Sequence, residues 1–427
     1  MSLLIKNASL PSGKKTDVLV EGGKISKIGS FSSNAEEKLD ASGKLLIPGL
    51  INTHTHAAMT LFRGIAEDME LAKWLSSVRR AEMLVTPPQI RAGTDLAILE
   101  MIRSGTTCFS DMYFHMDEVA ASVLESGMRA VLGYSMVDGG NAAGTQQSAN
   151  EKKMNSELSI AEKFVKDWHG KAEGRITSSI PPHSIYLCSG ELLKKSHQLS
   201  EKYGVVLHIH LSETRKEVFD CLKANGKRPS HYLDSLRVLS RRTVAAHCVW
   251  LTKEEVKLLA GKGVSASLNP VSNMKLAGGG ASPMPEMEKS GMNISLGTDG
   301  SASNNSLSMF ETIKFAALLQ KNARWDASVA SAESVFQAAT LGGARALGIP
   351  AGEIKEGKLA DLVLVDAAAP NMVPSHSIVA NIAYAAHAGN VTDVIINGKV
   401  VMRERKVLTM DEEKIVERAQ KEAERLS

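Results

Sequence analysis

Histidines cluster at the ends of apolar segments in this sequence, in a pattern typical of a metal site. His54 and His56 follow one apolar run, and His208 and His210 lie late in another. Side chains two residues apart on a strand project from the same face, so each pair can reach a single ion. The spacing therefore predicts two strands that each present imidazoles to a shared point.

Three further ionisable residues extend this pattern. Glu213 follows His210 by three positions, and His247 and Asp299 end or closely follow other apolar runs. Any one buried histidine by itself fits a structural role in a core. The chain has only 12 histidines, however, and their concentration at strand ends favours a shared metal. Imidazole and carboxylate ligands suit zinc or iron(II), with one coordination position left for water.

The central part of the chain alternates short apolar runs with helical segments. The expected strands are 130–137, 175–180, 205–211, 243–249, 264–268 and 293–296. The expected helices include 88–102, 191–203, 253–260 and 309–319. Strand–helix alternation of this length predicts an α/β fold, either a parallel barrel or a doubly wound sheet. A (β/α)8 TIM-type barrel is favoured because the ionisable residues come just past the ends of several separate strands.

Both ends of the chain carry short β-like runs, each too small to bury a core alone. The N-terminal runs are 3–5, 17–20, 24–28 and 45–47, and the C-terminal runs are 361–365 and 393–396. We therefore predict one small β-sandwich domain built from residues 1–49 and 351–409, beside a barrel domain of residues 50–350. Residues 410–427 have apolar positions at helical spacing after Asp411, which predicts a surface helix.

Composition argues against several other classes of protein. The net charge of +3 and the lack of long like-charge runs argue against nucleic-acid binding. No apolar stretch approaches the roughly 18 residues of a membrane span, and the N-terminus does not resemble a signal peptide. The four cysteines are scattered and form no C-x-x-C pair, which predicts reduced thiols in a cytoplasmic protein. These cysteines are Cys108, Cys188, Cys221 and Cys248.

The motifs resemble those of the amidohydrolase superfamily, in order and over nearly the whole chain. The matching strings are PGLINTHTH at 48–56, HIHLSE at 208–213, AHCV at 246–249, LGTDG at 296–300 and GKLADL at 357–362. The resemblance implies that one divalent metal is held by His54, His56, His210 and Asp299, with His208 as a neighbour and not a ligand. No lysine suggests the carbamylated bridge of two-metal members. Zinc is the first expectation, with iron(II), nickel(II) and manganese(II) as alternatives because metal availability decides among them.

Within this superfamily the chain is most similar to the methylthioadenosine/S-adenosylhomocysteine deaminases. The strings that carry the likeness are AAMTLFRG at 57–64, DMYF at 111–114, PHS at 182–184 and ASNNSL at 302–307. The resemblance implies that metal-bound hydroxide deaminates an adenosine-type nucleoside to its inosine analogue. In that chemistry Glu213 would protonate the ring nitrogen N1, while His247 and Asp299 would take or orient the proton of the attacking water.

Substrate-binding residues are carried over from the same resemblance. Glu82 would receive the ribose hydroxyls, since a carboxylate can accept two hydrogen bonds at once. His183 would line the purine pocket. An aromatic ring at Trp74 fits either a cover over the purine or a core position.

One region departs from the family pattern. Members that accept S-adenosylhomocysteine hold its amino-acid carboxylate with arginines in the region that follows Val137 here, and Tyr134 and Ser135 occupy the strand end in this chain. Residues 139–150 of this chain contain no charged side chain. Arginine is the side chain best suited to bind a carboxylate, because its planar guanidinium can donate two hydrogen bonds at once. We therefore expect a small or apolar 5′ group, as in methylthioadenosine, 5′-deoxyadenosine or adenosine. S-adenosylhomocysteine would need a more distant cation such as Lys152 or Arg324.

Two rival hypotheses remain open. The same fold and metal could serve a guanine, cytosine or triazine hydrolase, but Glu82 argues against this because a free base has no ribose. A non-catalytic scaffold should lack metal ligands, whereas this chain has the full set. The expected partner is thus a small nucleoside, and the resemblance is compatible with a homo-oligomer.

Overall fold

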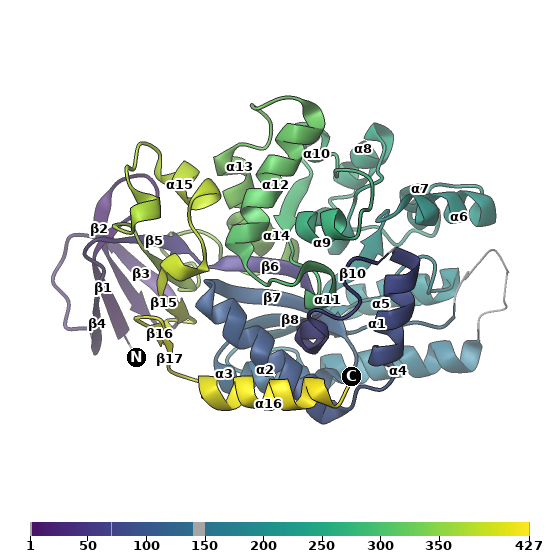
Figure 1. The fold of residues 1–427 in the computed structure, drawn as a ribbon, viewed down its shortest axis with the longest axis horizontal. Coiled ribbons are helices and arrows are strands. Elements are labelled where there is room, and N and C mark those ends of the chain that lie inside the picture. The colour runs from purple at the N-terminus through teal and green to yellow at the C-terminus, as the bar shows by residue number, and fades with distance from the viewer. Residues whose placement is uncertain (1, 70, 140–149, 427) are drawn as a thin grey trace.

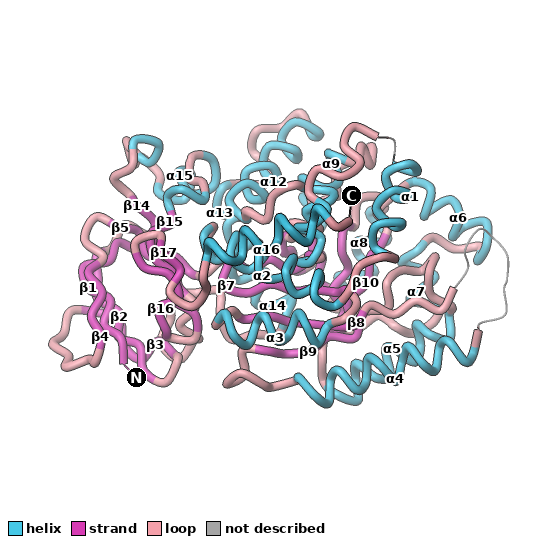
Figure 2. Tube along the Cα trace, turned by 60° about the horizontal axis from the view of Figure 1, so that its bottom comes forward, coloured by secondary structure: helices cyan, strands magenta, loops and turns pink. Residues whose placement is uncertain are grey.

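The computed structural model describes residues 2–69, 71–139 and 150–426, and two separate β-sheets organise them (Figure 1). One is a mixed sheet built from both ends of the chain. The other consists of parallel strands from the middle of the chain. Figure 2 shows the mixed sheet at one end of the molecule and the helices surrounding the parallel strands at the other.

The nine-stranded mixed sheet joins residues from the two chain ends. Its N-terminal strands are β1 (Ser2–Ser9), β2 (Lys15–Glu21), β3 (Lys24–Gly29), β4 (Glu37–Asp40) and β5 (Lys44–Pro48). Its C-terminal strands are β14 (Leu362–Asp366), β15 (Val391–Ile396), β16 (Lys399–Arg403) and β17 (Lys406–Val407). The antiparallel pair β5–β14 connects the two groups, with Leu46 opposite Leu364. Neither end could bury these apolar side chains without the other.

The second sheet has eight strands in sequence order, and every neighbouring pair is parallel. The strands are β6 (Leu50–Thr55), β7 (Thr106–Tyr113), β8 (Arg129–Tyr134), β9 (Ile176–Ile180), β10 (Val206–Leu211), β11 (Thr243–His247), β12 (Ser265–Leu268) and β13 (Asn293–Leu296). The first and last strands meet as well. The Thr53 hydroxyl donates to the Leu296 carbonyl at 2.9 Å, and the Asp299 amide donates to the His54 carbonyl at 2.9 Å. The parallel strands therefore form a barrel-like ring whose carboxyl ends share one face.

Helices follow the strands and cover the outside of this ring (Figure 1). The longer ones are α1 (Leu71–Glu82), α2 (Pro87–Arg103), α3 (Met116–Ser126), α4 (Glu151–Trp168), α5 (Gly190–Tyr203), α6 (Arg215–Asn225), α8 (Lys253–Gly261), α12 (Met309–Arg324) and α16 (Glu412–Glu424). The shorter ones are α7 (Pro229–Ser235), α9 (Pro270–Lys275), α10 (Met284–Lys289), α11 (Ser301–Asn304), α13 (Ala332–Gln337), α14 (Gly343–Leu347) and α15 (Ile378–Tyr384). The predicted final helix is confirmed as α16, which packs along α2 and is capped by Asp411.

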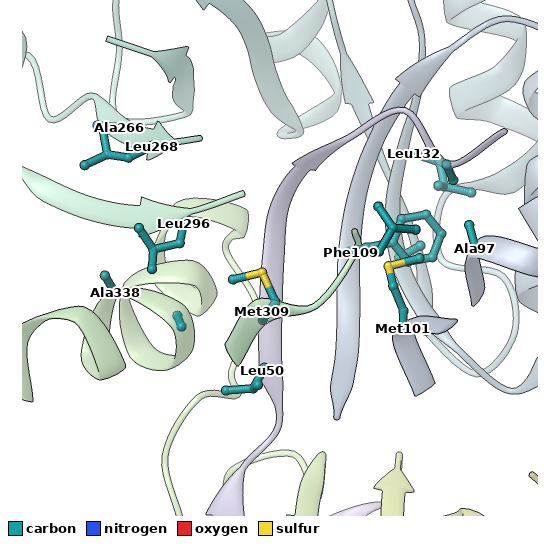
Figure 3. Packing of buried hydrophobic residues seen from close by; sticks show 14 of the residues in the cluster. Leu50, Ala97, Met101, Phe109, Leu132, Ala266, Leu268, Leu296, Met309 and Ala338 are labelled. Carbon is teal, nitrogen blue, oxygen red and sulfur yellow. The ribbon is translucent and has the colours of Figure 1, made fainter. Parts of the chain in front are cut away.

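The main apolar core lies between the strands and these helices. Figure 3 shows Phe109 and Leu132 of neighbouring strands facing Met101 and Ala97 of α2. The interior of the ring is instead partly polar. There the hydroxyl of Thr53 lies 2.6 Å from that of Ser267. Successive residues of each strand thus point alternately outward, into the apolar core beneath the helices, and inward, into the partly polar interior of the ring.

Two features of the strands are clear only in the structure. The apolar run 45–51 contributes to both β5 and β6, which belong to different sheets and are separated at Gly49. A Cβ at Gly49 would lie 2.0 Å from the Thr107 side chain, so the chain passes where only glycine fits. Strand β7 was not predicted, because buried Thr, Ser and Asp residues interrupt its apolar pattern. Among the described residues, no helix is long and apolar enough to span a bilayer.

Candidate active site

Three histidines converge at the carboxyl ends of β6 and β10. His54 lies in β6, His56 directly follows it, and His210 lies in β10. One ring nitrogen from each of the three lies within 4.8 Å of the others. The loop after β13 packs closely against this cluster, since a Cβ at Gly297 would lie only 2.8 Å from the Cβ of His54. The period-two spacing in the sequence therefore brings these imidazoles together as expected.

The Nδ1 atom of each of these histidines is occupied by a hydrogen bond. Nδ1 of His56 lies 2.8 Å from the Met112 carbonyl, and Nδ1 of His210 lies 2.7 Å from the His183 carbonyl. A carbonyl only accepts, so both Nδ1 atoms carry the proton and both Nε2 lone pairs are free. Such partners fix the tautomer and ring orientation of metal-binding histidines.

His54 is oriented by a second buried histidine. Its Nδ1 lies 3.0 Å from Nε2 of His208, whose own Nδ1 lies 3.2 Å from the Ser110 hydroxyl. If His54 donates to His208 and His208 donates to Ser110, all three groups are satisfied in neutral form. Burial lowers the pKa values of His54 and His208 well below the usual range, which agrees with neutral rings. His208 thus lies behind the cluster and supports it.

Asp299 completes the cluster with a carboxylate. Its Oδ1 lies 3.5 Å from Nε2 of His54 and 3.4 Å from Nε2 of His56. The hydroxyls of Ser272 and Ser303 donate to Oδ2 at 2.6 and 3.0 Å. Burial opposes ionisation, but the nearby imidazoles of His54, His247 and His56 lower the pKa of Asp299 well below its usual range. Asp299 therefore remains a carboxylate with one oxygen directed at the histidines.

This donor set fits a divalent metal. Nε2 of His54 is buried and has no hydrogen-bond partner in the described structure, and such an atom is costly unless something binds it. Burial also lowers the pKa of His210 to about 4, so this imidazole is neutral and available as a ligand at neutral pH. Three imidazole nitrogens and one carboxylate oxygen are ligands that zinc and similar metals prefer. His54, His56, His210 and Asp299 would hold the ion.

His247 stands beside the cluster in a different tautomer. The side-chain amides of Asn273 and Asn269 donate to its Nδ1 at 3.0 and 3.3 Å. The proton of the neutral ring therefore sits on Nε2, which lies 3.9 Å from Oε2 of Glu213. A protonated Nε2 cannot bind a metal, but it can donate to a ligand or a water at the cluster. His247 has φ +71°, a conformation that places its ring here at the cost of local strain.

Glu213 lies just past β10 and faces the same point. Burial raises the pKa of this carboxyl to about 7, and the charge of Asp299 adds to the effect. A carboxyl that is half protonated near neutral pH can give up or take a proton without a large penalty. Glu213 therefore has the properties of a general acid next to the cluster.

A cavity of about 1170 Å³ opens from this cluster toward α1, α3, α4 and α6. His183 lines it and stacks on His210, with ring centroids 4.4 Å apart. Glu82 lines it as well, and its Oε1 accepts a hydrogen bond from the Tyr113 hydroxyl at 2.8 Å. The Tyr113 ring is 5.9 Å from that of His56, so one tyrosine spans the distance from the cluster to Glu82.

Some predicted residues lie outside what the structure describes. The backbone of Trp74 belongs to α1, but its side chain is not among the described ones, so its role stays a prediction. Most of the segment 139–150 also lies outside the described residues. Arg324, named as a distant cation, is paired with Glu286 and does not line the cavity.

The structure also reveals supporting residues that the sequence analysis missed. Asp111, fully buried at the end of β7, accepts from the Ala57 amide at 3.3 Å, and burial raises its pKa to about 7. Ser272, Asn273 and Tyr113 hold Asp299, His247 and Glu82, respectively. Tyr113 lies within the DMYF string at 111–114, but no role for its hydroxyl followed from the sequence, and no spacing marks Ser272 or Asn273.

The chain belongs to the amidohydrolase family, whose sequence profile matches residues 45–401. It is 44% identical over 423 residues to the 5′-deoxyadenosine deaminase of Methanocaldococcus jannaschii, covering 98% of both chains. Its fold superimposes with a TM-score of 0.92 on a zinc-bound adenosine deaminase from Xanthomonas campestris, at 33% identity and with 99% and 98% of the two chains covered. Family, relatives and the histidine–aspartate cluster define a metal-dependent hydrolytic deaminase.

A more distant neighbour shares the fold alone. The atrazine chlorohydrolase of Arthrobacter aurescens superimposes with a TM-score of 0.92 but is only 23% identical, with 99% of this chain and 100% of the other covered. This likeness confirms the architecture and carries no information about the substrate.

Proposed function

We propose that this protein is a zinc-dependent deaminase of adenosine-type nucleosides with a small or apolar 5′ group, with 5′-deoxyadenosine as the preferred substrate. The observation that carries the proposal is the placement of Glu213 and His247 beside the ligand cluster, in a cavity that also contains Glu82. The similarity to 5′-deoxyadenosine deaminases over the whole chain supports it.

The side chains divide the proton chemistry between them. When bound, the metal activates a water for attack at neutral pH. Glu213 protonates N1 of the adenine ring as the water oxygen adds to C6. Asp299 takes the proton that the water releases, and His247 holds the oxygen in place through its Nε2 proton. Asp299 then passes this water-derived proton to the amino group, which leaves as ammonia. The C6 hydroxyl loses its remaining proton to Glu213, which restores the acid and leaves the inosine analogue. General acid–base assistance of this kind contributes about 10²- to 10⁴-fold in rate.

The proposed ribose contact separates nucleosides from free bases. Glu82 has one oxygen engaged by Tyr113, and a carboxylate has further lone pairs for the 2′- and 3′-hydroxyls. A guanine, cytosine or triazine substrate has no ribose hydroxyls to donate to this carboxylate. The pairing of Tyr113 with Glu82 therefore favours a nucleoside over the free-base alternative.

The charges around the cavity favour a small 5′ group. No arginine lines the cavity among the described residues. Its two lysines, Lys163 and Lys216, are each paired with an aspartate one helical turn away, Asp167 and Asp220. These lysines are 74% and 81% exposed, so they are solvated rim residues and not a preformed carboxylate site. A homocysteine carboxylate would have to compete with existing partners.

A substrate panel tests the proposal directly. Purified protein with its metal content measured should convert 5′-deoxyadenosine, methylthioadenosine and adenosine, as followed by the ultraviolet change from adenine to hypoxanthine. We expect kcat/KM for 5′-deoxyadenosine to exceed that for S-adenosylhomocysteine and for free adenine at least tenfold. A clear preference for S-adenosylhomocysteine would contradict the 5′-group argument. Activity only on free bases or triazines would contradict the nucleoside assignment.

The metal needs its own measurement. Apo protein reconstituted with zinc, iron(II), nickel(II) or manganese(II) should be most active with zinc at equal occupancy. If turnover is higher with iron(II), the proposed ligands stay the same and iron(II) replaces zinc as the proposed metal.

A further inference from the structure

Glu217 of α6 is a buried glutamate next to the active site that the proposed chemistry does not use. Its side chain is 5% exposed, and both carboxylate oxygens accept backbone hydrogen bonds. Oε1 accepts from the amide of Ser212 and Oε2 from the amide of Glu213, each at 2.8 Å. These two amides form the turn that carries the Glu213 side chain into the cavity.

The position of Glu217 in its helix predicts a simpler role. Thr214 is the N-cap of α6, and its hydroxyl accepts from the Glu217 amide at 3.1 Å. Thr-x-x-Glu at a helix start usually forms a capping box, in which the glutamate returns to the amide of the N-cap residue. A capping role would stabilise α6 and have no consequence for catalysis.

Helix α8 contains the same pattern and does form that box. Its N-cap Thr252 accepts from the Glu255 amide, and Glu255 accepts from the Thr252 amide at 3.0 Å. Glu255 is buried, as is Glu217. The two glutamates thus share residue type, helix position, N-cap residue and burial, but their partners differ. Glu217 reaches past its N-cap to the two preceding amides, whereas Oε2 of Glu255 is paired with Nε of Arg228 at 2.7 Å.

The turn that Glu217 binds needs an external support. Ser212 has φ +52°, a conformation unfavourable for a residue with a side chain. The Ser212 carbonyl accepts from the Trp250 amide at 2.8 Å, which fixes the other side of the turn. With Glu217 on the amides and Trp250 on the carbonyl, the backbone from which Glu213 projects has little freedom.

We propose that Glu217 is a positioning residue that holds the Ser212–Glu213 turn so that the Glu213 carboxyl reaches the substrate ring. This inference rests on the proposed role of Glu213 in deamination. Displacement of a catalytic group by about 1 Å can cost about 10²-fold in rate, because the reacting atoms lose their alignment. Loss of Glu217 should therefore lower kcat more than it affects KM, since the metal ligands and Glu82 stay in place.

The test compares Glu217→Asp and Glu217→Gln with Glu255→Asp and Glu255→Gln. Aspartate still suits a helix N-terminus but is one methylene too short to bind both turn amides. We expect Glu217→Asp to fold, to keep its metal and to lose kcat about 10- to 100-fold, with KM for 5′-deoxyadenosine changed less than about threefold. Glu255→Asp should keep kcat within about twofold of the wild type, even if its melting temperature falls as much as that of Glu217→Asp. A Glu217→Asp variant with wild-type kcat would overturn the proposal.

Two further measurements separate positioning from general destabilisation. In a Glu213→Gln background, Glu217→Asp should cost little more, because a positioning residue acts only through the group it positions. If Glu217→Asp lowers kcat as much in the Glu213→Gln background as in the wild type, the proposal is overturned. Hydrogen exchange of the peptide 211–218, measured without substrate, should be faster in Glu217→Asp and unchanged in Glu255→Asp. If the wild-type protein deaminates no adenosine nucleoside, the proposed function fails, and this exchange measurement still decides whether Glu217 holds the turn.

Discussion

His208 offers the sharpest test of how the protein prepares its metal site. His56 and His210 are oriented by backbone carbonyls, which substitution cannot remove. His54 is oriented by a side chain, through the 3.0 Å contact between its Nδ1 and Nε2 of His208. Replacement of His208 by phenylalanine removes this acceptor and keeps an aromatic ring of similar size. It therefore isolates the hydrogen bond from the packing.

The expected size of the effect follows from the burial of the pair. His54 and His208 are both fully buried, so no water can replace the lost acceptor. A buried donor left without a partner costs about 1–3 kcal/mol. Loss of such an outer partner usually weakens metal affinity about 10- to 100-fold, which equals about 1.4–2.7 kcal/mol. We expect His208→Phe to bind zinc within that range of weakening.

Zinc affinity can be measured by competition with a chromophoric chelator, beside the melting temperature of the apo protein. Ser110→Ala is the matched control, because the Ser110 hydroxyl lies against the far nitrogen of His208 and its loss should change zinc affinity less than about threefold. If His208→Phe binds zinc as tightly as the wild type, the tautomer of His54 is not set by this contact and the reasoning is refuted.

Three other predictions concern the acid, the ribose contact and the junction of the two sheets. Glu213 must be protonated to donate, and its pKa is raised to about 7, so kcat/KM should be highest below that pH and fall as pH rises through it. Glu213→Gln should keep its metal but lose most turnover together with this pH limb, and near-normal rates would exclude Glu213. Tyr113→Phe should raise KM for adenosine about fivefold by releasing Glu82, and leave KM for 2′,3′-dideoxyadenosine unchanged. An equal effect on both substrates would contradict the ribose role. Arg129 and Asp361 form a buried ion pair, with Nε and Oδ2 2.6 Å apart, so Arg129→Met should lower the free energy of unfolding by about 3–5 kcal/mol in urea titrations. A loss below about 1 kcal/mol would show that this pair does not stabilise the contact between the sheets.

Much of the architecture could be predicted because the repeating patterns are local. Alternating strand and helix signals indicated most barrel strands, and the helices α2, α5, α8 and α12 were found within a few residues of their limits, apart from the C-terminal end of α12. Strand β7 escaped because its residues are all buried but half of them are polar. Hydropathy reads such a segment as exposed, whereas every residue of β7 is buried in the fold.

The sequence by itself determined the ligand types and their spacing. His-x-His places two imidazoles on one face of a strand wherever that strand lies, because side chains alternate along an extended backbone. The sequence also determined that Glu213 follows His210 by three positions, close enough to lie beside the histidine cluster.

Only the tertiary structure decided how chemically identical residues divide their roles. His208 and His210 share a strand and a face, but His210 meets the cluster while His208 stands behind His54. Glu217 and Glu255 follow the same capping pattern, but only Glu217 holds the turn of the active site. The reason is physical: tautomer and burial depend on neighbours that can lie far away in the sequence, as His54 and His208 lie 154 residues apart and come near only when the ring of strands closes.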